Sequence, residues 1–160
     1  MKEVKIESMF TVYEDLSELP DDIQQLMQSA IQTREKAYAP YSKFKVGAAI
    51  LLDNKEVIIG SNQENASYPS GLCAERTAIY YAGAKHPASK ILKMAITASS
   101  QNQITDSPIP PCGACRQAIS EYEIKQEQPI EIYFMGATGK VIKSNSLSNL
   151  LPLAFDRGFL

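Results

Sequence analysis

The chain has 160 residues, of which 44% are apolar, a composition typical of one globular domain with a single core. Sixteen basic and eighteen acidic residues give a net charge of −2 without a long run of either sign, which argues against binding to a nucleic-acid backbone. The sequence has no run of eighteen apolar residues to span a membrane, and its start lacks the apolar region of a signal peptide.

The first part of the chain predicts a strand followed by a helix. Apolar residues at even positions within 1–13 indicate a short strand. Apolar residues spaced three and four apart between 23 and 37 predict an amphipathic helix. This helix follows Pro20, and Asp21 or Asp22 is the expected N-cap.

The rest of the chain alternates between predicted strands and helices, beginning with a hairpin. This order predicts an α/β fold, a three-layer α/β/α sandwich with a mixed central sheet of about five strands. We expect residues 1–160 to form one domain, with 1–20 as an extra N-terminal segment. The predicted strands are 46–52, 56–60, 91–97, 130–135 and 141–142, and the predicted helices are 74–84, 113–122 and a short one through 148–150.

All three cysteines fall in two short clusters at predicted helix starts. Cys73 precedes one helix, and Cys112 and Cys115 straddle the start of the next. Positions three apart share a helix face, so the pair can meet one ion, and helix N-termini favour thiolates. An odd number of clustered thiols favours a metal over disulfides and a reducing compartment, with the cytoplasm as the default. Three protein ligands leave a fourth position for water, which is the arrangement of catalytic zinc.

Charged residues lie next to both clusters. Glu75 is two residues from Cys73, so on a helix it diverges from the ligand and can approach the metal from the side as a proton carrier. The alternative is a first-turn glutamate that complements the helix dipole. Arg76 and Arg116 each follow a cluster, and we expect their guanidinium groups to donate to the thiolates and offset the charge of a zinc with three sulfurs. For each arginine, a solvated helix face is the alternative.

Five segments together resemble the small, homotetrameric cytidine deaminases. The resemblance runs from about residue 23 to 155, with the motifs in order. It implies a cytidine deaminase-like fold, a cytoplasmic homotetramer, one zinc per subunit and hydrolytic deamination of cytidine and deoxycytidine to the uridines with release of ammonia, in pyrimidine salvage. The segments are YAPYSKFKVGAA (38–49), NQENAS (62–67), CAERTA (73–78), PCGACRQ (111–117) and LLPLAF (150–155).

The resemblance also implies a role for each matched residue. Glu75 is the proton shuttle of the family's chemistry. The zinc ligands are Cys73, Cys112 and Cys115. The substrate-binding residues are Asn62 and Glu64 for the sugar hydroxyls, Phe44 against the base, Ala74, and Tyr68 and Phe155, which reach a neighbouring subunit's site.

Two alternatives to a cytidine deaminase stay open on the sequence. A deaminase of modified nucleosides would share the zinc centre, although the sugar-reading pair Asn62 and Glu64 argues against it. A structural zinc module would need a fourth protein ligand, for which His86, the only histidine, is the candidate. The residues before the first helix and the proline-rich loop 100–111 have no role implied by the resemblance.

Overall fold

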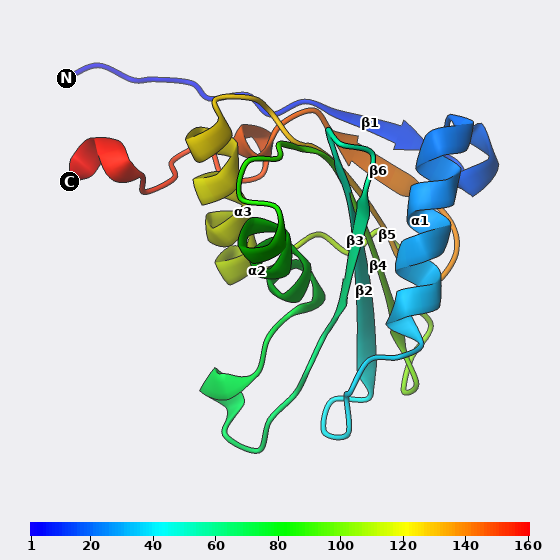
Figure 1. Ribbon diagram of the computed structural model, residues 1–160. Helices are drawn as coiled ribbons and strands as arrows, with labels where there is room; N and C mark the ends of the chain where they lie inside the picture. Colours follow the sequence, from blue (N-terminus) through cyan, green and yellow to red (C-terminus); the bar gives the residue numbers. More distant parts are fainter.

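The computed structural model describes residues 1–160, which form a six-stranded mixed sheet with helices on both faces (Figure 1). None of the helices is long and apolar enough to cross a membrane. The strands are β1 (Phe10–Tyr13), β2 (Phe44–Leu52), β3 (Val57–Ser61), β4 (Ile91–Ser100), β5 (Glu131–Met135) and β6 (Val141–Ser144). The α-helices are α1 (Asp21–Arg34), α2 (Ala74–Lys85) and α3 (Gly113–Gln126), and the short 3-10 helices are η1 (Leu16–Glu18), η2 (Tyr68–Ser70), η3 (Leu147–Asn149) and η4 (Arg157–Phe159).

The sheet has the strand order β1-β6-β5-β4-β2-β3. Only β4 and β5 run parallel to each other, and every other neighbouring pair is antiparallel. Helix α1 covers one face of the sheet, and α2 and α3 cover the other (Figure 1). This architecture confirms the predicted three-layer fold. The sheet has one strand more than expected, because β1 from the N-terminal segment adds to the edge beside β6.

Two apolar cores fill the spaces on either side of the sheet. Along β2, Ala48 and Ile50 belong to the core beneath α2 and α3, whereas Ala49 belongs to the core beneath α1. Because both faces of the central strands are covered, apolar residues are needed at every position and not only at alternate ones. The continuous apolar runs 46–52 and 91–97 therefore identified these strands correctly.

The ends of α1 differ from the prediction. Its N-cap is Pro20, so the expected aspartate cap is wrong, and Asp21 and Asp22 instead lie in the first turn, where their charge faces the positive end of the helix dipole. The helix ends earlier than the apolar spacing indicated, at Arg34. The buried guanidinium of Arg34 donates to Thr97 Oγ1 at 2.8 Å, which fixes this helix end against β4.

The segment before α1 is anchored to the sheet edge. In the antiparallel pairing of β1 with β6, Phe10 lies opposite Ser144 and Tyr13 lies opposite Val141. Leu19 is buried in the core beneath α1, and Tyr13 packs against the same core. The predicted N-terminal strand is therefore present, but it begins only at Phe10.

Gly47 of β2 lies directly against the backbone of α1. A Cβ atom at Gly47 would be 2.1 Å from the carbonyl oxygen of Ala30 and 2.5 Å from the backbone nitrogen of Arg34. We expect Gly47→Ala to lower the free energy of unfolding by about 3 kcal/mol, because the helix must move off the sheet to make room. Gly113→Ala is the matched control, since a Cβ there meets nothing within 4 Å. Denaturant unfolding of the zinc-loaded proteins measures both, and equal stability of the two variants would contradict this packing.

Candidate active site

Two helix starts bring the three cysteines together. Cys73 is the N-cap of α2, Cys112 is the N-cap of α3, and Cys115 lies in the first turn of α3. The Sγ atoms of Cys73 and Cys112 are 3.9 Å apart, and those of Cys112 and Cys115 are 3.5 Å apart. Sulfur atoms about 2.3 Å from a zinc ion at tetrahedral angles lie roughly 3.8 Å from one another. The triad therefore fits three corners of a zinc site.

The charges in the triad also fit a cation. A hydrogen bond from Cys115 and the guanidinium of Arg76 lower the pKa of Cys73 to about 5. The pKa of Cys115 is raised, because its thiol donates to Cys73 and because it is buried. Three sulfurs at these separations cannot all ionise unaided, since like charges repel. A divalent cation removes this conflict, and zinc, with its affinity for thiolates, matches the donor set.

The two arginines beside the clusters behave differently. Arg76 directs Nη2 toward Cys73 Sγ at 3.7 Å, as expected. Arg116 does not contact the sulfurs: its Nε donates to the Pro111 carbonyl at 2.9 Å and its Nη1 donates to the Leu150 carbonyl at 2.8 Å. A residue that follows a ligand on a helix points about 100° away from it, which explains why the sequence neighbour of Cys115 is not a sulfur contact.

Glu75 lies beside the triad and is almost fully buried. As the second residue of α2 it is only 4% exposed, and it lines the same cavity as Cys73 and Cys112. Burial raises the pKa of Glu75, and the negative charge on Cys73 raises it further. A carboxyl group with a raised pKa is suited both to accept and to donate a proton near neutral pH.

A cavity of about 420 Å³ opens beside Glu75, a size that suits a small-molecule ligand. A second cavity of about 450 Å³ adjoins it, and both are lined by Ser42, Asn62 and Glu64. Sequence reasoning missed most of the apolar wall, because aliphatic side chains in strands and loops carry no chemical signal. The missed apolar residues that line the cavity beside Glu75 are Val46, Ile96, Ala98, Ile109 and Pro110, and the polar Ser42 was missed as well.

The carboxylate of Glu64 is fixed by the turn at Ser42. One oxygen accepts from the backbone N–H groups of Tyr41 at 2.9 Å and Ser42 at 3.3 Å, and the other accepts from the Ser42 hydroxyl. Although partial burial opposes ionisation, these hydrogen bonds lower the pKa of Glu64 below its ordinary value. A charged carboxylate in a fixed orientation is therefore present at the junction of the two cavities.

Asn62 joins the cavity to the start of β2. Its Oδ1 accepts from the Val46 N–H at 2.8 Å, and its Nδ2 donates to the Phe44 carbonyl at 2.9 Å. An amide side chain offers two N–H donors and two acceptor lone pairs, so one of each stays available for a ligand. Phe44 lines the same cavity, and its backbone is held in place by the Asn62 amide.

The remaining candidate residues lie at different distances from the cavity. Ala74 is buried at the first position of α2. Tyr68 is 75% exposed and lines the second cavity. Phe155 is 59% exposed and lines neither cavity; its ring stacks on Phe159, and its carbonyl accepts from Gln117 Nε2 at 2.8 Å. Within one chain, Phe155 is therefore not brought to the site.

His86 lies at the opposite end of α2 from Cys73. A helix of twelve residues, as α2 is, places its two ends about 18 Å apart. The Nε2 atom of His86 is 3.1 Å from an oxygen of Glu56. Its position excludes His86 as a fourth ligand of the triad.

Comparisons with known proteins agree with this geometry. The sequence pattern of the family described as "Cytidine and deoxycytidylate deaminase zinc-binding region" matches residues 20–128. A cytidine deaminase of Halalkalibacterium halodurans is 42% identical over 134 residues, which are 84% of this chain and 94% of that protein. A crystal structure of a cytidine deaminase from Burkholderia pseudomallei superposes with a TM-score of 0.70 at 40% identity, covering 82% of this chain and 97% of the other. The cytidine deaminase structure from Mycobacterium tuberculosis gives a TM-score of 0.66 at 31% identity, covering 86% and 99% of the two chains. The chain belongs to the cytidine and deoxycytidylate deaminase family.

Proposed function

We propose that this chain is a zinc-dependent enzyme that hydrolyses cytidine and deoxycytidine to the corresponding uridines and ammonia. The observation that carries the proposal is the burial of Glu75 in the cavity that Cys73 and Cys112 also line. A structural zinc site has no need of a buried acid beside it. The three free thiols indicate a reducing compartment, and we place the reaction in the cytoplasm.

The reaction requires two proton transfers, both of which we assign to Glu75. Bound zinc supplies a nucleophile at neutral pH, because it lowers the pKa of water from about 15.7 to roughly 7. Glu75 accepts the proton that the attacking water loses and passes it to N3 of the cytosine ring. After the water oxygen has bonded to C4, Glu75 takes the remaining proton of that oxygen and delivers it to the amino group; the C4–N4 bond then breaks to release ammonia as the C4 carbonyl forms.

The two sides of the cavity suit the two halves of a nucleoside. The apolar wall that includes Phe44, Val46 and Ile96 matches the faces of a pyrimidine ring. The amide of Asn62 and the carboxylate of Glu64 can hydrogen-bond sugar hydroxyls, which carry no charge for an arginine or lysine to recognise. We therefore assign nucleosides, and not free bases, as the substrates.

Ultraviolet absorbance of the pyrimidine ring measures the reaction directly. Purified protein should convert cytidine and deoxycytidine at rates proportional to its zinc content, determined on the same sample. Faster turnover of modified cytidines than of cytidine would favour the deaminase of modified nucleosides. Full zinc loading without turnover of any nucleoside would favour a structural zinc module.

Asn62→Ala is expected to reduce kcat/KM for cytidine by roughly 10- to 100-fold, because sugar hydroxyls lose a buried hydrogen-bonding partner. The loss should be much smaller for free cytosine, which has no sugar. Paired measurements of kcat/KM on the nucleoside and the base test this difference. Equal losses on both substrates would show that Asn62 acts only by supporting the start of β2.

We also propose that the enzyme is a homotetramer in which neighbouring subunits complete each site with Tyr68 and Phe155. The exposure of these residues supports this assignment, since Tyr68 is 75% and Phe155 is 59% exposed within its own chain. The side chain of Gln117, two residues after Cys115, holds the carbonyl of Phe155. Helix α3, which carries Cys115, therefore also positions the segment around Phe155 that we propose to reach the neighbouring subunit's site.

Co-expression of two inactive variants tests the sharing of Phe155. Glu75→Gln and Phe155→Ala chains should together regain activity, because roughly a quarter of the sites combine an intact Glu75 with an intact Phe155 from the neighbour. Each variant alone should be nearly inactive. Glu75→Gln co-expressed with Glu75→Ala is the control that cannot recover, and failure of the first mixture to exceed it would place Phe155 outside the neighbour's site.

A further inference from the structure

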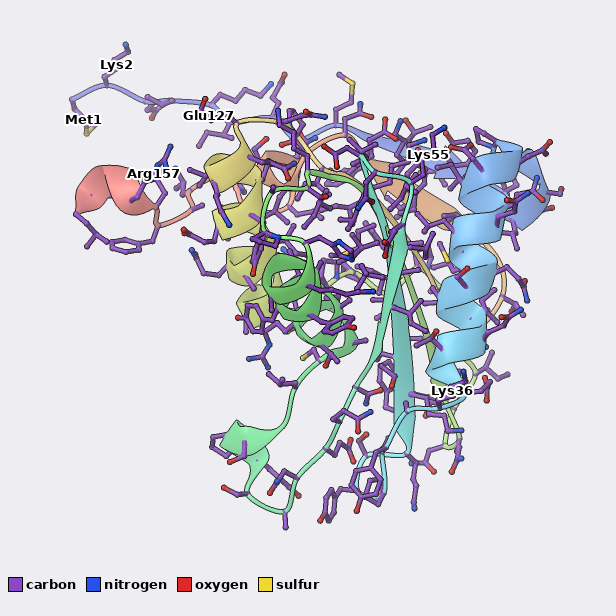
Figure 2. The ribbon with its side chains drawn as sticks, viewed as in Figure 1. Met1, Lys2, Lys36, Lys55, Glu127 and Arg157 are labelled. Atoms are coloured by element: carbon purple, nitrogen blue, oxygen red, sulfur yellow. The ribbon has the colours of Figure 1, made fainter.

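The N-terminal arm, residues 1–9, continues β1 away from the body of the protein. It runs almost straight from β1 (Figure 1), with Met1 and Lys2 at its far end (Figure 2). One hydrogen bond, from Met9 N–H to Asn149 Oδ1 at 3.4 Å, joins the arm to the rest of the chain. The family region begins at residue 20, so neither the arm nor β1 belongs to the matched part.

If the alternation of β1 continues into the arm, the two segments share one apolar face. Tyr13 packs on the core beneath α1, so the even positions of β1 point to the opposite face of the sheet. The even positions are 75% exposed at Val4, 51% at Ile6, 40% at Phe10 and 53% at Val12. Apart from Ser8 at its middle, the row is apolar and exposed, although it follows the regular alternation of a strand that is buried on one side.

The outer edge of β1 is also unpaired in hydrogen bonding. In the sheet order, β1 is terminal and β6 is its only neighbour. Edge strands present unsatisfied N–H and C=O groups that can accept another strand, and proteins normally limit this with short or charged edges. Here the arm makes the edge longer. A strand added to it would pair with the free backbone N–H and C=O groups and would also cover the apolar row.

We infer that the arm and β1 pair antiparallel with the same segment of a second copy of this chain, about a two-fold axis at Ser8. In this register Val4 lies opposite the second copy's Val12, and Ile6 lies opposite the second copy's Phe10. Lys2 lies opposite the second copy's Glu14, and no two like charges are opposed. A segment that matches itself in both apolar and charged positions is what an isologous contact requires.

Cross-linking at the symmetry axis tests the register. A Ser8→Cys variant of the zinc-loaded enzyme, treated with a short bismaleimide, should form a covalent dimer at about ten times the yield of Ser17→Cys, because pairing gives the second thiol a high effective concentration. Ser17 is exposed beyond the far end of β1, where the register separates the two copies widely. The unsubstituted enzyme shows any background from the zinc-binding thiols. Equal yields from Ser8→Cys and Ser17→Cys would overturn the inference.

A charge introduced into the apolar row tests whether the second copy covers that row. In the Ser8→Cys background, Ile6→Asp should lower the yield of covalent dimer about tenfold, because it places a carboxylate opposite Phe10. The matched control is Ile104→Asp, since Ile104 is an exposed isoleucine far from the arm in sequence, and it should leave the yield unchanged. An unchanged yield with Ile6→Asp, or the same drop with both variants, would overturn the pairing. Neither readout depends on the proposed deaminase activity.

Discussion

Glu75→Gln is expected to lower kcat by about 10⁴-fold, at the upper end of what a single general acid–base group contributes, because one carboxyl group serves both proton transfers. The amide has nearly the same shape, so the fold and the neighbouring thiolates should be unaffected. Zinc analysis should therefore still find one ion per chain. Steady-state kinetics on cytidine and metal analysis of the same sample measure the two quantities.

Glu121→Gln provides the matched control for this loss. Glu121 is an exposed glutamate on α3, and the same change there removes the same charge without touching the cavity. We expect wild-type turnover from this control. If Glu75→Gln retained even a tenth of the wild-type kcat, another group would have to carry the protons.

Cys112→Ser is expected to abolish zinc binding and turnover together, because a hydroxyl is a far weaker ligand for zinc than a thiolate. Cys112 is the exposed member of the triad, so the change costs little packing and reports mainly on the metal. At zinc concentrations about a thousandfold above the dissociation constant of the wild type, the variant should lose roughly 4 kcal/mol of unfolding free energy. Metal analysis and thermal unfolding with and without zinc measure both effects.

A chelator supplies the control for the metal site. The wild-type protein should fall to the stability of Cys112→Ser when zinc is removed, whereas the variant should not respond. His86→Ala should gain as much stability from zinc as the wild type does, because His86 lies at the far end of α2 and only its contact with Glu56 is lost. A Cys112→Ser protein that still gained stability from zinc would point to a different ligand set.

The metal centre could be predicted from the sequence because its determinants are local. The spacing of Cys112 and Cys115 is a property of one helix turn, and the position of Cys73 before a helix follows from the pattern of the residues after it. Only the convergence of the two helix starts depends on the whole fold, and alternation of strands and helices was enough to predict it. The same logic explains why Glu75 could be placed beside the metal.

Contacts between distant segments could not be predicted in this way. The hydrogen bond from Ser42 to Glu64 joins a turn before β2 to a loop after β3. Nothing in the sequence of either segment indicates that the two are in contact. The contacts of Arg116 with the carbonyls of Pro111 and Leu150 were missed for a similar reason, since the sequence gives adjacency along the chain but not the direction of a side chain. The aspartate cap of α1 failed because Pro20 can occupy that position and leave the acids one step inside the helix.

The double attachment of Asn62 to Phe44 and Val46 limits how the enzyme can be redesigned. A substitution at Asn62 that is meant to change the preference for the sugar also removes the hydrogen bonds that hold Phe44 and Val46. The selectivity for the sugar and the selectivity for the base would therefore change together. Ser42 and Glu64 make no such attachment to β2 beyond the N–H of Phe44, which donates to the Ser42 hydroxyl. Libraries aimed at unnatural sugars should therefore vary residue 64 first and keep the asparagine.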